Sequence, residues 1–340
     1  MGKTVAMTGG GTGGHLAIVK AVKEQMGETP LIYIGSEGGQ DRRWFGEDEG
    51  FVARYFLKTR GVVNQGIFGK ILSLGMLARE VRRCLKIFRE QEVGLVFSVG
   101  GYSAAPAAIA AILARIDLVI HEQNAAPGTL NRLLRPYAAA FLSSYEEESP
   151  LKAYPISSIF FEKARVRGRI RKILFLGGSQ GAQAINDLAL QLAPELRRRG
   201  IGIIHQAGER NQEQVRDAYA RLGIEAEVFG FSDRIPEYMA QADLAVARAG
   251  ASSMWELAAN GLPALFVPYP YAAGDHQYHN AKFLADRGLA WVVRQKELKP
   301  EHVLDLLDRD LEPVSRGLIE YTPRNGAAEI ARFLREKAGV

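Results

Sequence analysis

The chain has 340 residues, of which 47% are hydrophobic and 24% charged, and its formal net charge is +5. This length and composition predict a globular protein with two domains. A single cysteine, Cys84, excludes a disulfide framework and a cysteine-cluster metal site. No apolar run approaches the roughly 20 residues that a membrane-spanning helix needs, and we find no secretion signal, so we expect a cytoplasmic protein.

The positive charge is concentrated in one segment. Residues 54–89 contain nine basic residues and one acidic residue, Glu80, which gives a local net charge of +8. Apolar residues such as Ile67 and Leu74 alternate with the basic ones. This mixture suits an anionic membrane surface, although a helix with one buried and one solvated face has the same pattern. We expect residues of about 64–89 to bind an anionic membrane surface, and we expect no nucleic-acid partner.

In chain order, short apolar and β-branched runs alternate with patterns of helical period. The runs that predict strands are residues 4–8, 31–35, 94–100, 118–122, 172–178, 201–208, 225–231, 243–250 and 263–269. Strands that alternate with amphipathic helices imply parallel sheets covered on both faces.

The chain repeats one pattern. "TVAMTGGGTGGH" at residues 4–15 and "KILFLGGSQGA" at 172–182 each join an apolar strand, a glycine-rich turn and a helix start. The repeat predicts an α/β fold with two Rossmann-like domains, residues 1–150 and 165–320, separated by an acidic linker that contains Pro and Ser. A C-terminal helix at about 326–340 could pack back on the first domain.

Both glycine-rich turns suit a phosphate-bearing ligand. Backbone N–H groups approach an anion closely in such a turn, and the helix N-terminus adds partial positive charge. Gly9, Gly11 and Gly14 also match the dinucleotide fingerprint G-x-G-x-x-G, and Glu37 lies near the place of its ribose-binding acid. An NAD-dependent oxidoreductase is therefore one alternative, and ordinary tight turns are another.

Three further stretches carry polar residues at strand ends. "HEQN" at 121–124 places four polar residues where burial without partners is costly, so Asn124 either caps a turn or binds a substrate hydroxyl. Ser253-x-x-Glu256 has the spacing of a capping box, yet Glu256 could equally bind a ribose diol. In "GDHQYHNA", at 274–281, the histidines lack a familiar ligand spacing with a third partner, so we expect no metal site.

In combination these motifs resemble those of the MurG family of N-acetylglucosaminyltransferases of peptidoglycan synthesis. "GGGTGGH", "GGYSAAPA", "HEQN", "GGSQGA" and "ARAGASSMWELAANGLPALFVPYPYAAGDHQYHNA" occur in the family's order, from Gly9 to about Asn280. The resemblance implies a GT-B fold, in which two Rossmann-like domains face each other across a cleft. It also implies transfer of N-acetylglucosamine, with inversion, from UDP-GlcNAc to the 4-hydroxyl of MurNAc in undecaprenyl-pyrophosphoryl-MurNAc-pentapeptide (lipid I). Such an enzyme would use neither metal nor cofactor and would work at the cytoplasmic face of the cell membrane as a peripheral protein.

The resemblance also implies site residues in both domains. On the donor side it implies Ser179 at a phosphate, Phe231 and Ser232 at uracil, Ala251, Ser252 and Ser253 at the pyrophosphate, Glu256 at the ribose, and His276 and Gln277 at the GlcNAc hydroxyls. On the acceptor side it implies Thr12, Gly13, Gly14, His15 and Asn124, with His15 and Asn124 as the catalytic residues. His15 has the near-neutral reference pKa of a general base, but it could instead hold the acceptor pyrophosphate.

Two positions depart from the family pattern. Ile18 replaces a proline of the first helix, and Ser157 stands where the family has a linker arginine that contacts the donor. Either Lys163 or Arg165 replaces that arginine, or backbone groups alone hold the donor phosphate. The departure keeps other readings open: a UDP-GlcNAc 2-epimerase, an NAD-dependent oxidoreductase or a sugar-nucleotide binding protein.

Overall fold

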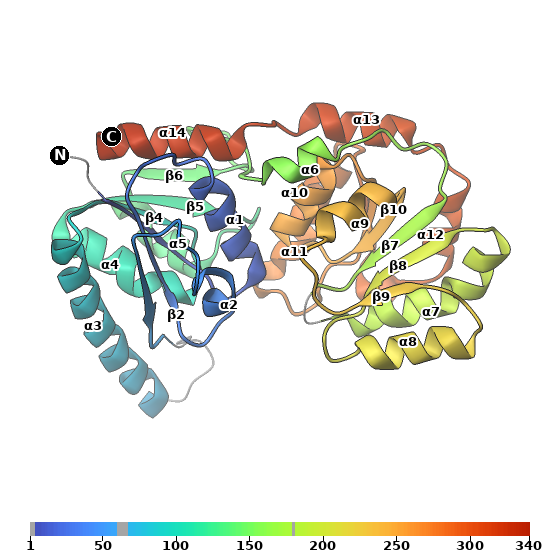
Figure 1. The fold of residues 1–340 in the computed structure, drawn as a ribbon, viewed down its shortest axis with the longest axis horizontal. Coiled ribbons are helices and arrows are strands. Elements are labelled where there is room, and N and C mark those ends of the chain that lie inside the picture. Colours follow the sequence, from blue (N-terminus) through green and yellow to red (C-terminus); the bar gives the residue numbers. More distant parts are fainter. Residues whose placement is uncertain (1–3, 60–66, 179–180) are drawn as a thin grey trace. The chain divides into compact units, whose positions relative to one another are not determined.

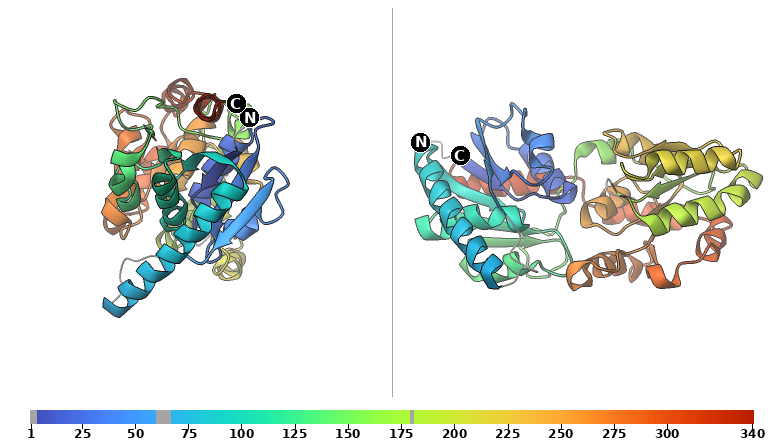
Figure 2. Two further views of the ribbon diagram at one scale, coloured as in Figure 1. Left: turned by 90° about the vertical axis from the view of Figure 1, so that its left-hand side faces the viewer. Right: turned by 90° about the horizontal axis from the view of Figure 1, so that it is seen from below.

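A computed structural model describes residues 4–59, 67–178 and 181–340, without the side chains of 67–72. The described chain forms two compact units (Figures 1 and 2). Unit 1 comprises Met1–Ser157 and Asn325–Val340, and unit 2 comprises Ser158–Arg324. Each unit is built on one parallel six-stranded sheet.

Unit 1 alternates strands and helices along the chain. Its elements are β1 (Thr4–Thr8), α1 (Gly13–Lys23), β2 (Leu31–Ser36), α2 (Asp41–Phe45), β3 (Ala53–Leu57), α3 (Ile67–Glu90), β4 (Val93–Ser98), α4 (Ala105–Ala114), β5 (Asp117–Glu122), α5 (Thr129–Leu134), β6 (Ala140–Ser143) and the C-terminal α14 (Gly326–Ala338). The sheet order is β3-β2-β1-β4-β5-β6.

Unit 2 repeats this arrangement. Its elements are α6 (Ser158–Glu162), β7 (Lys172–Leu176), α7 (Gln183–Arg198), β8 (Gly202–Gln206), α8 (Gln212–Arg221), β9 (Glu227–Phe229), α9 (Ile235–Gln241), β10 (Leu244–Ala247), α10 (Ala251–Ala259), β11 (Ala264–Phe266), α11 (His276–Ala285), β12 (Trp291–Val292), α12 (Glu301–Leu307) and α13 (Glu312–Tyr321). The sheet order is β12-β11-β10-β7-β8-β9.

All nine runs predicted as strands contribute to these sheets, but three strands escaped prediction. They are β3, β6 and β12, each of which lies at an edge of its sheet. Their sequences, "ARYFL", "AFLS" and "WV", are short, and each strand contains partly exposed residues. An edge strand does not need the continuous apolar run that burial on both faces demands, so its sequence signal is weak.

Amphipathic helices supply the cores. In unit 1, α3 and α4 pack against one face of the sheet, with Cys84, Phe88 and Ala107 fully or almost fully buried there. In unit 2, α7 places Leu188, Leu192 and Leu196 against the sheet. The C-terminal helix α14 packs on α1 and β4 of unit 1, alongside the blue α1 in Figure 1.

In both units the strand order reverses at one point, which fixes where ligands bind. The sheet grows in one direction from β1 through β2 and β3, and in the other through β4; unit 2 does the same at β7 and β10. Ligands of open α/β sheets bind at the carboxyl ends of the strands at such a switch point. The loops after β1 and β4, and those after β7 and β10, are therefore the places to look for function.

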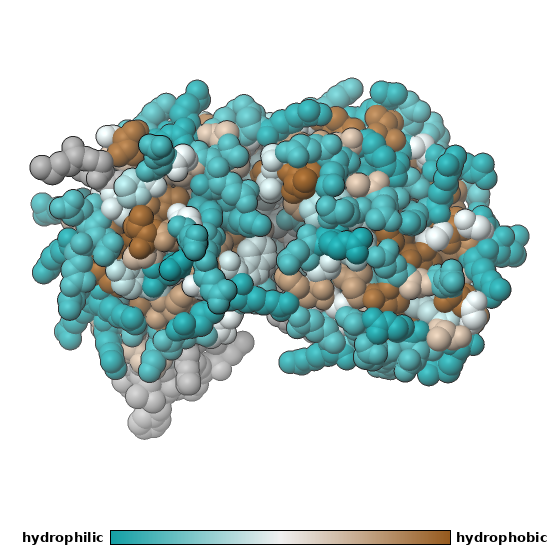
Figure 3. Space-filling view, in the orientation of Figure 1, coloured by the Kyte–Doolittle hydropathy of each residue, from teal (hydrophilic) through white to brown (hydrophobic). Residues whose placement is uncertain are grey.

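The face of the protein shown in Figure 3 is mainly hydrophilic, with hydrophobic residues in small groups. Within the described ranges, no helix combines the length and the apolar composition that crossing a bilayer requires.

Candidate active site

The first glycine-rich loop of unit 1 is held by a buried carboxylate. Asp41, at the start of α2, accepts hydrogen bonds from the Gly11 N–H (2.8 Å), the Ser36 N–H (2.8 Å) and the Tyr33 hydroxyl (2.9 Å). A β-carbon at Gly10 would collide with this carboxylate, which explains a glycine there. Sequence reasoning missed Asp41, because its partners lie up to 30 residues away.

His15 lies where the predicted acceptor loops meet. Its Nδ1 is 2.8 Å from the Thr12 hydroxyl, and its Nε2 is 2.9 Å from the Gln123 side-chain nitrogen. A β-carbon at Gly101, in the loop after β4, would lie 3.5 Å from the imidazole. The loops after β1, β4 and β5 thus converge on His15, and Gln123 is a partner that sequence reasoning quoted but did not select.

The polar run after β5 is organised by Glu122. This buried carboxylate accepts from the Asn124 N–H (2.9 Å), the Gly128 N–H (3.0 Å) and the Asn131 side chain (2.9 Å). The network fixes the backbone of Asn124 beside Gln123, the partner of His15. Asn124 therefore lies in a turn that is hydrogen-bonded by its own preceding glutamate.

His121 is fully buried in the same run. Neither of its ring nitrogens has a hydrogen-bond partner among the residues that the structure describes. Burial, followed by the proximity of His15, lowers the pKa of His121 to about 3. His121 is therefore neutral at physiological pH, so a change of charge in this pair near neutral pH belongs to His15.

In unit 2, the loops at the switch point are the turn after β7 and the start of α10. The Gly178 N–H donates to the Gln206 side chain (3.1 Å), which ties the turn to β8. Ser179, predicted at a phosphate, lies outside the described residues. α10 begins at Ala251, so the N–H groups of Ala251, Ser252 and Ser253 form its first turn, where an anion is favoured.

The capping box predicted at Ser253 is wrong. The N-cap is Gly250, whose carbonyl already accepts from the Met254 N–H (2.9 Å), and Ser253 is the third residue of the helix. The extended backbone of Gly250, with ψ of 137°, starts the helix earlier than the Ser-x-x-Glu spacing indicated. Glu256 is therefore not a backbone cap, and the alternative that it binds a ligand remains.

Glu256 has the properties of a ligand-binding carboxyl. It is partly buried on α10 and accepts no hydrogen bond from the described part of the chain. Burial raises its pKa to about 7, from a usual value of 4.5. Because an ionised carboxylate without donors is unfavourable in such a place, hydroxyl donors of a ligand would stabilise it.

Residues of α11 brace the turn between β10 and α10. The Gln277 side-chain oxygen accepts from the Ala249 N–H (3.2 Å) and the Tyr269 N–H (3.0 Å), and the buried Asn280 donates to the Ala249 carbonyl (3.2 Å). His276, at the start of α11, has its Nδ1 2.9 Å from the Ala273 carbonyl. The structure therefore gives Gln277 a positioning role and leaves His276 Nε2 for a ligand.

The remaining donor residues follow β9. Phe231 and Ser232 are partly exposed, and the Ser232 hydroxyl accepts from the Arg234 N–H at 3.1 Å. The two cations considered as replacements for the linker arginine are both engaged elsewhere. Lys163 pairs with Glu237 (3.4 Å) and Arg165 with Asp243 (2.6 Å).

Among the described residues, no group of three or more His, Cys, Asp and Glu side chains is placed to hold a metal ion. Thr12, Gly13, Gly14 and His15 lie at the start of α1, and the donor candidates lie at or near the switch point of unit 2. Each unit thus presents the start of a helix and polar side chains at the carboxyl edge of its sheet. The two units together define a two-domain α/β protein of the GT-B class.

Comparison with known proteins agrees with this class. The model of the glycosyltransferase family 28 N-terminal domain matches residues 5–143, and that of the family 28 C-terminal domain matches residues 172–333. A UDP-N-acetylglucosamine--N-acetylmuramyl-(pentapeptide) pyrophosphoryl-undecaprenol N-acetylglucosamine transferase from a Sulfurovum species is 58% identical over 98% of this chain and 99% of its own. The protein of the same name from Wolinella succinogenes is 54% identical over 97% and 99%.

A solved structure is also similar over nearly the whole chain. The crystal structure of Acinetobacter baumannii MurG has a TM-score of 0.80 at 28% identity, covering 98% of this chain and 99% of that one. The chain belongs to glycosyltransferase family 28. The predicted GT-B fold class and the predicted family resemblance are both confirmed.

Proposed function

We propose that the protein is a hexosyltransferase that transfers N-acetylglucosamine from UDP-GlcNAc to the 4-hydroxyl of MurNAc in lipid I, with inversion, in peptidoglycan synthesis. The observation that carries this proposal is the identity of 58% to a relative of that name over almost the full length of both chains. The sites at both switch points have the hydrogen-bonding groups that the reaction needs.

The donor is assigned to unit 2. The first turn of α10, with Ser252 and Ser253, favours the pyrophosphate, because its N–H groups and helix dipole stabilise negative charge. Glu256 accepts the ribose hydroxyls, and Phe231 and Ser232 lie beside uracil. His276 and Gln277 face the GlcNAc hydroxyls, and Ser179 contacts a phosphate. The helix N-terminus also stabilises charge that develops on the leaving UDP.

The acceptor is assigned to unit 1, where Thr12, Gly13, Gly14, His15 and Asn124 face the sugar and its pyrophosphate. His15 Nε2 takes the proton of the attacking hydroxyl. In the structure this nitrogen is paired with Gln123, so the hydroxyl displaces that amide when it binds. Asn124 then hydrogen-bonds the sugar, because Glu122 fixes its backbone.

The lipid acceptor requires approach to a membrane, which we assign to α3 at the cytoplasmic face. On the described part of this helix, Arg79, Arg82 and Lys86 are exposed, whereas Val81 and Phe88 are buried in the core. Leu74 is 57% exposed on the same helix. The basic face is therefore available to anionic headgroups, and the predicted residues 64–66, together with the side chains of 67–72, lie outside the description.

The proposal is tested by following UDP release with UDP-GlcNAc and a lipid I analogue in the presence of EDTA. We expect release only when both substrates are present, with disaccharide formed in equal amount. UDP release without acceptor, as an epimerase gives, would contradict the proposal. Loss of activity with EDTA, restored by a divalent cation, would contradict the expectation of a metal-independent reaction.

A further inference from the structure

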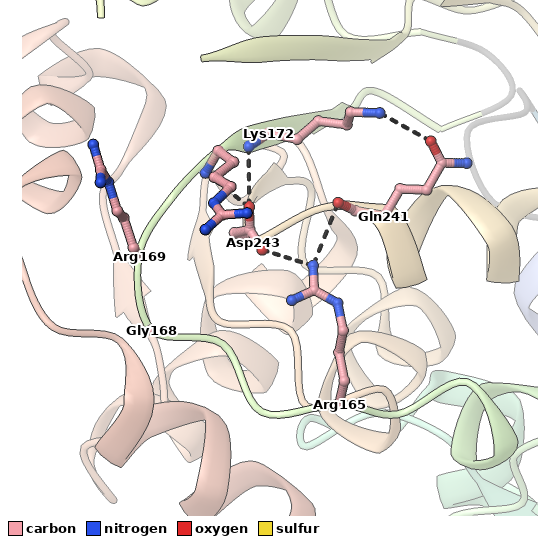
Figure 4. A pocket seen from close by; sticks show the side chains of 7 residues that line it. Arg165, Gly168, Arg169, Lys172, Gln241 and Asp243 are labelled. Atoms are coloured by element: carbon pink, nitrogen blue, oxygen red, sulfur yellow. Dashed lines mark hydrogen bonds and ion pairs between the residues drawn. The ribbon is translucent and has the colours of Figure 1, made fainter. Parts of the chain in front are cut away.

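A pocket of unit 2 lies away from the proposed donor site. It has a volume of about 430 Å³ and is lined by Arg165, Gly168, Arg169, Arg171, Lys172, Gln241 and Asp243 (Figure 4). Lys172 is the first residue of β7, and Asp243 directly precedes β10. The pocket is therefore at the amino ends of these strands, whereas the proposed donor site is at their carboxyl ends.

The lining is strongly basic. Five of the eight residues from 165 to 172 are Arg or Lys, and Asp243 is the one acidic residue among the described residues that line the pocket. Arg167, directly behind the lining, is fully buried and bonds only uncharged acceptors, including the Asn260 side chain and the Met239 carbonyl. Burial and the nearby Arg165 lower the pKa of Arg167 to about 9, which reflects uncompensated positive charge.

The only lining carboxylate described is already saturated. Asp243 is 6% exposed and accepts from the Arg165 guanidinium (2.6 Å) and from the N–H groups of Arg171 (2.8 Å) and Lys172 (3.0 Å). In Figure 4, Arg165 and Asp243 point toward one another. These bonds make one wall rigid, and the Lys172 ammonium is held by the Gln241 side chain at 3.0 Å.

Two guanidinium groups remain for a ligand. Arg169 and Arg171 are exposed, and the described part of the chain offers neither side chain an ion pair or hydrogen bond. An arginine binds a phosphate through two parallel hydrogen bonds, so two free arginines suit two phosphate groups. The volume is within the range of small-molecule sites, and the described lining is polar throughout, unlike a surface that inserts into a membrane.

We infer that this pocket is a second, non-catalytic anion site for a small soluble ligand that carries two or more phosphate groups. Such a ligand neutralises the excess charge of the 165–172 segment. The inference does not depend on the proposed transferase activity, because the pocket lies at the opposite sheet edge and shares no residue with the proposed donor site.

The test measures binding of inorganic pyrophosphate by isothermal titration calorimetry to the full chain. Arg169→Ala/Arg171→Ala removes the two free cations, and Arg221→Ala/Lys299→Ala removes the same charge from exposed positions of the same unit. We expect roughly tenfold to hundredfold weaker binding in the first variant, from the loss of charged hydrogen bonds. The control should bind as the wild type does. Equal melting temperatures of the three proteins show that each is folded.

Hydrogen exchange locates the site independently. Pyrophosphate should protect peptides covering residues 165–172 in the wild type and not in Arg169→Ala/Arg171→Ala. Equal affinity in both double variants, or protection elsewhere alone, would overturn the inference. It would also be overturned if the Arg169/Arg171 variant lost binding to anionic vesicles while no protein bound pyrophosphate, since a membrane would then be the ligand.

Discussion

The hydrogen bonds of His15 show how single residues tune the proposed chemistry. Its two ring nitrogens are shared between Thr12 and Gln123. When the Gln123 amide donates to Nε2, Nδ1 carries the proton and donates to Thr12, which leaves Nε2 with the lone pair that a base requires. Replacing Gln123 by an acceptor hydroxyl preserves this tautomer.

We expect His15→Ala and His15→Asn both to lower kcat by roughly 10²-fold or more, a usual contribution of a general base. Asparagine can still donate a hydrogen bond to a pyrophosphate but cannot take a proton at neutral pH. Steady-state kinetics with a lipid I analogue separate the two roles. A near-normal kcat in His15→Asn, with a raised KM for the acceptor, would show that His15 holds the pyrophosphate instead.

The raised pKa of Glu256 predicts a pH dependence of donor binding. The carboxyl has a pKa of about 7 in the free protein, and ribose hydroxyls that donate to its ionised form lower that pKa in the complex. Affinity is therefore full above pH 7 and falls as the pH drops below it, by up to about tenfold per pH unit.

Titration with uridine avoids ionisable phosphate groups. We expect the affinity of the wild type to decline between pH 7.5 and about 5.5, and Glu256→Gln to bind weakly with little pH dependence. A wild-type affinity that is flat over this range would contradict the assignment of Glu256 to the ribose.

At the scale of elements, α3 combines two roles in one helix. Its buried residues Val81, Cys84 and Phe88 belong to the core, and Arg79 and Arg82 are exposed. The core helix and the basic surface, which were alternatives in the sequence, are therefore both present on the described part of α3. The helical period of 3.6 residues places the two sets on different faces.

Charge reversal on α3 tests the membrane proposal. We expect Arg79→Glu/Arg82→Glu to reduce binding to anionic vesicles at least tenfold, because each basic residue near such a surface contributes about 1 kcal/mol. Binding to neutral vesicles should not change. Arg132→Glu/Lys152→Glu, which alters two other exposed residues of unit 1, is the matched control in a co-sedimentation assay. An equal reduction in both variants would remove α3 as the membrane-binding element.

At the scale of the whole molecule, the two units are versions of one topology. Both sheets reverse direction after the first strand of the unit, and both carry a glycine-rich turn there. The G-x-G-x-x-G match at residue 9 is therefore correct as a turn and misleading as an indication of NAD. In unit 1 a buried carboxylate, Asp41, takes the Gly11 N–H, so this amide is not free for a phosphate.

The sequence by itself determined the strand–turn–helix pattern of both halves, the order of the motifs and the family. These features depend on residues close together in the chain, where periodicity and glycine content act directly. The edge strands β3, β6 and β12 and the true start of α10 at Ala251 were not predicted, because partial burial and local backbone geometry leave weak signals.

Only the tertiary structure decided which side chains act together. Gln123 meets His15 across 108 residues, Asp41 binds Gly11 across 30, and Asp243 binds the backbone at Arg171 across 72. Such contacts follow from how parallel strands bring their ends to one edge of a sheet, and no local pattern encodes them. The same packing left Glu256 without a partner among the described residues, which changed a supposed helix cap into the proposed ribose-binding carboxyl.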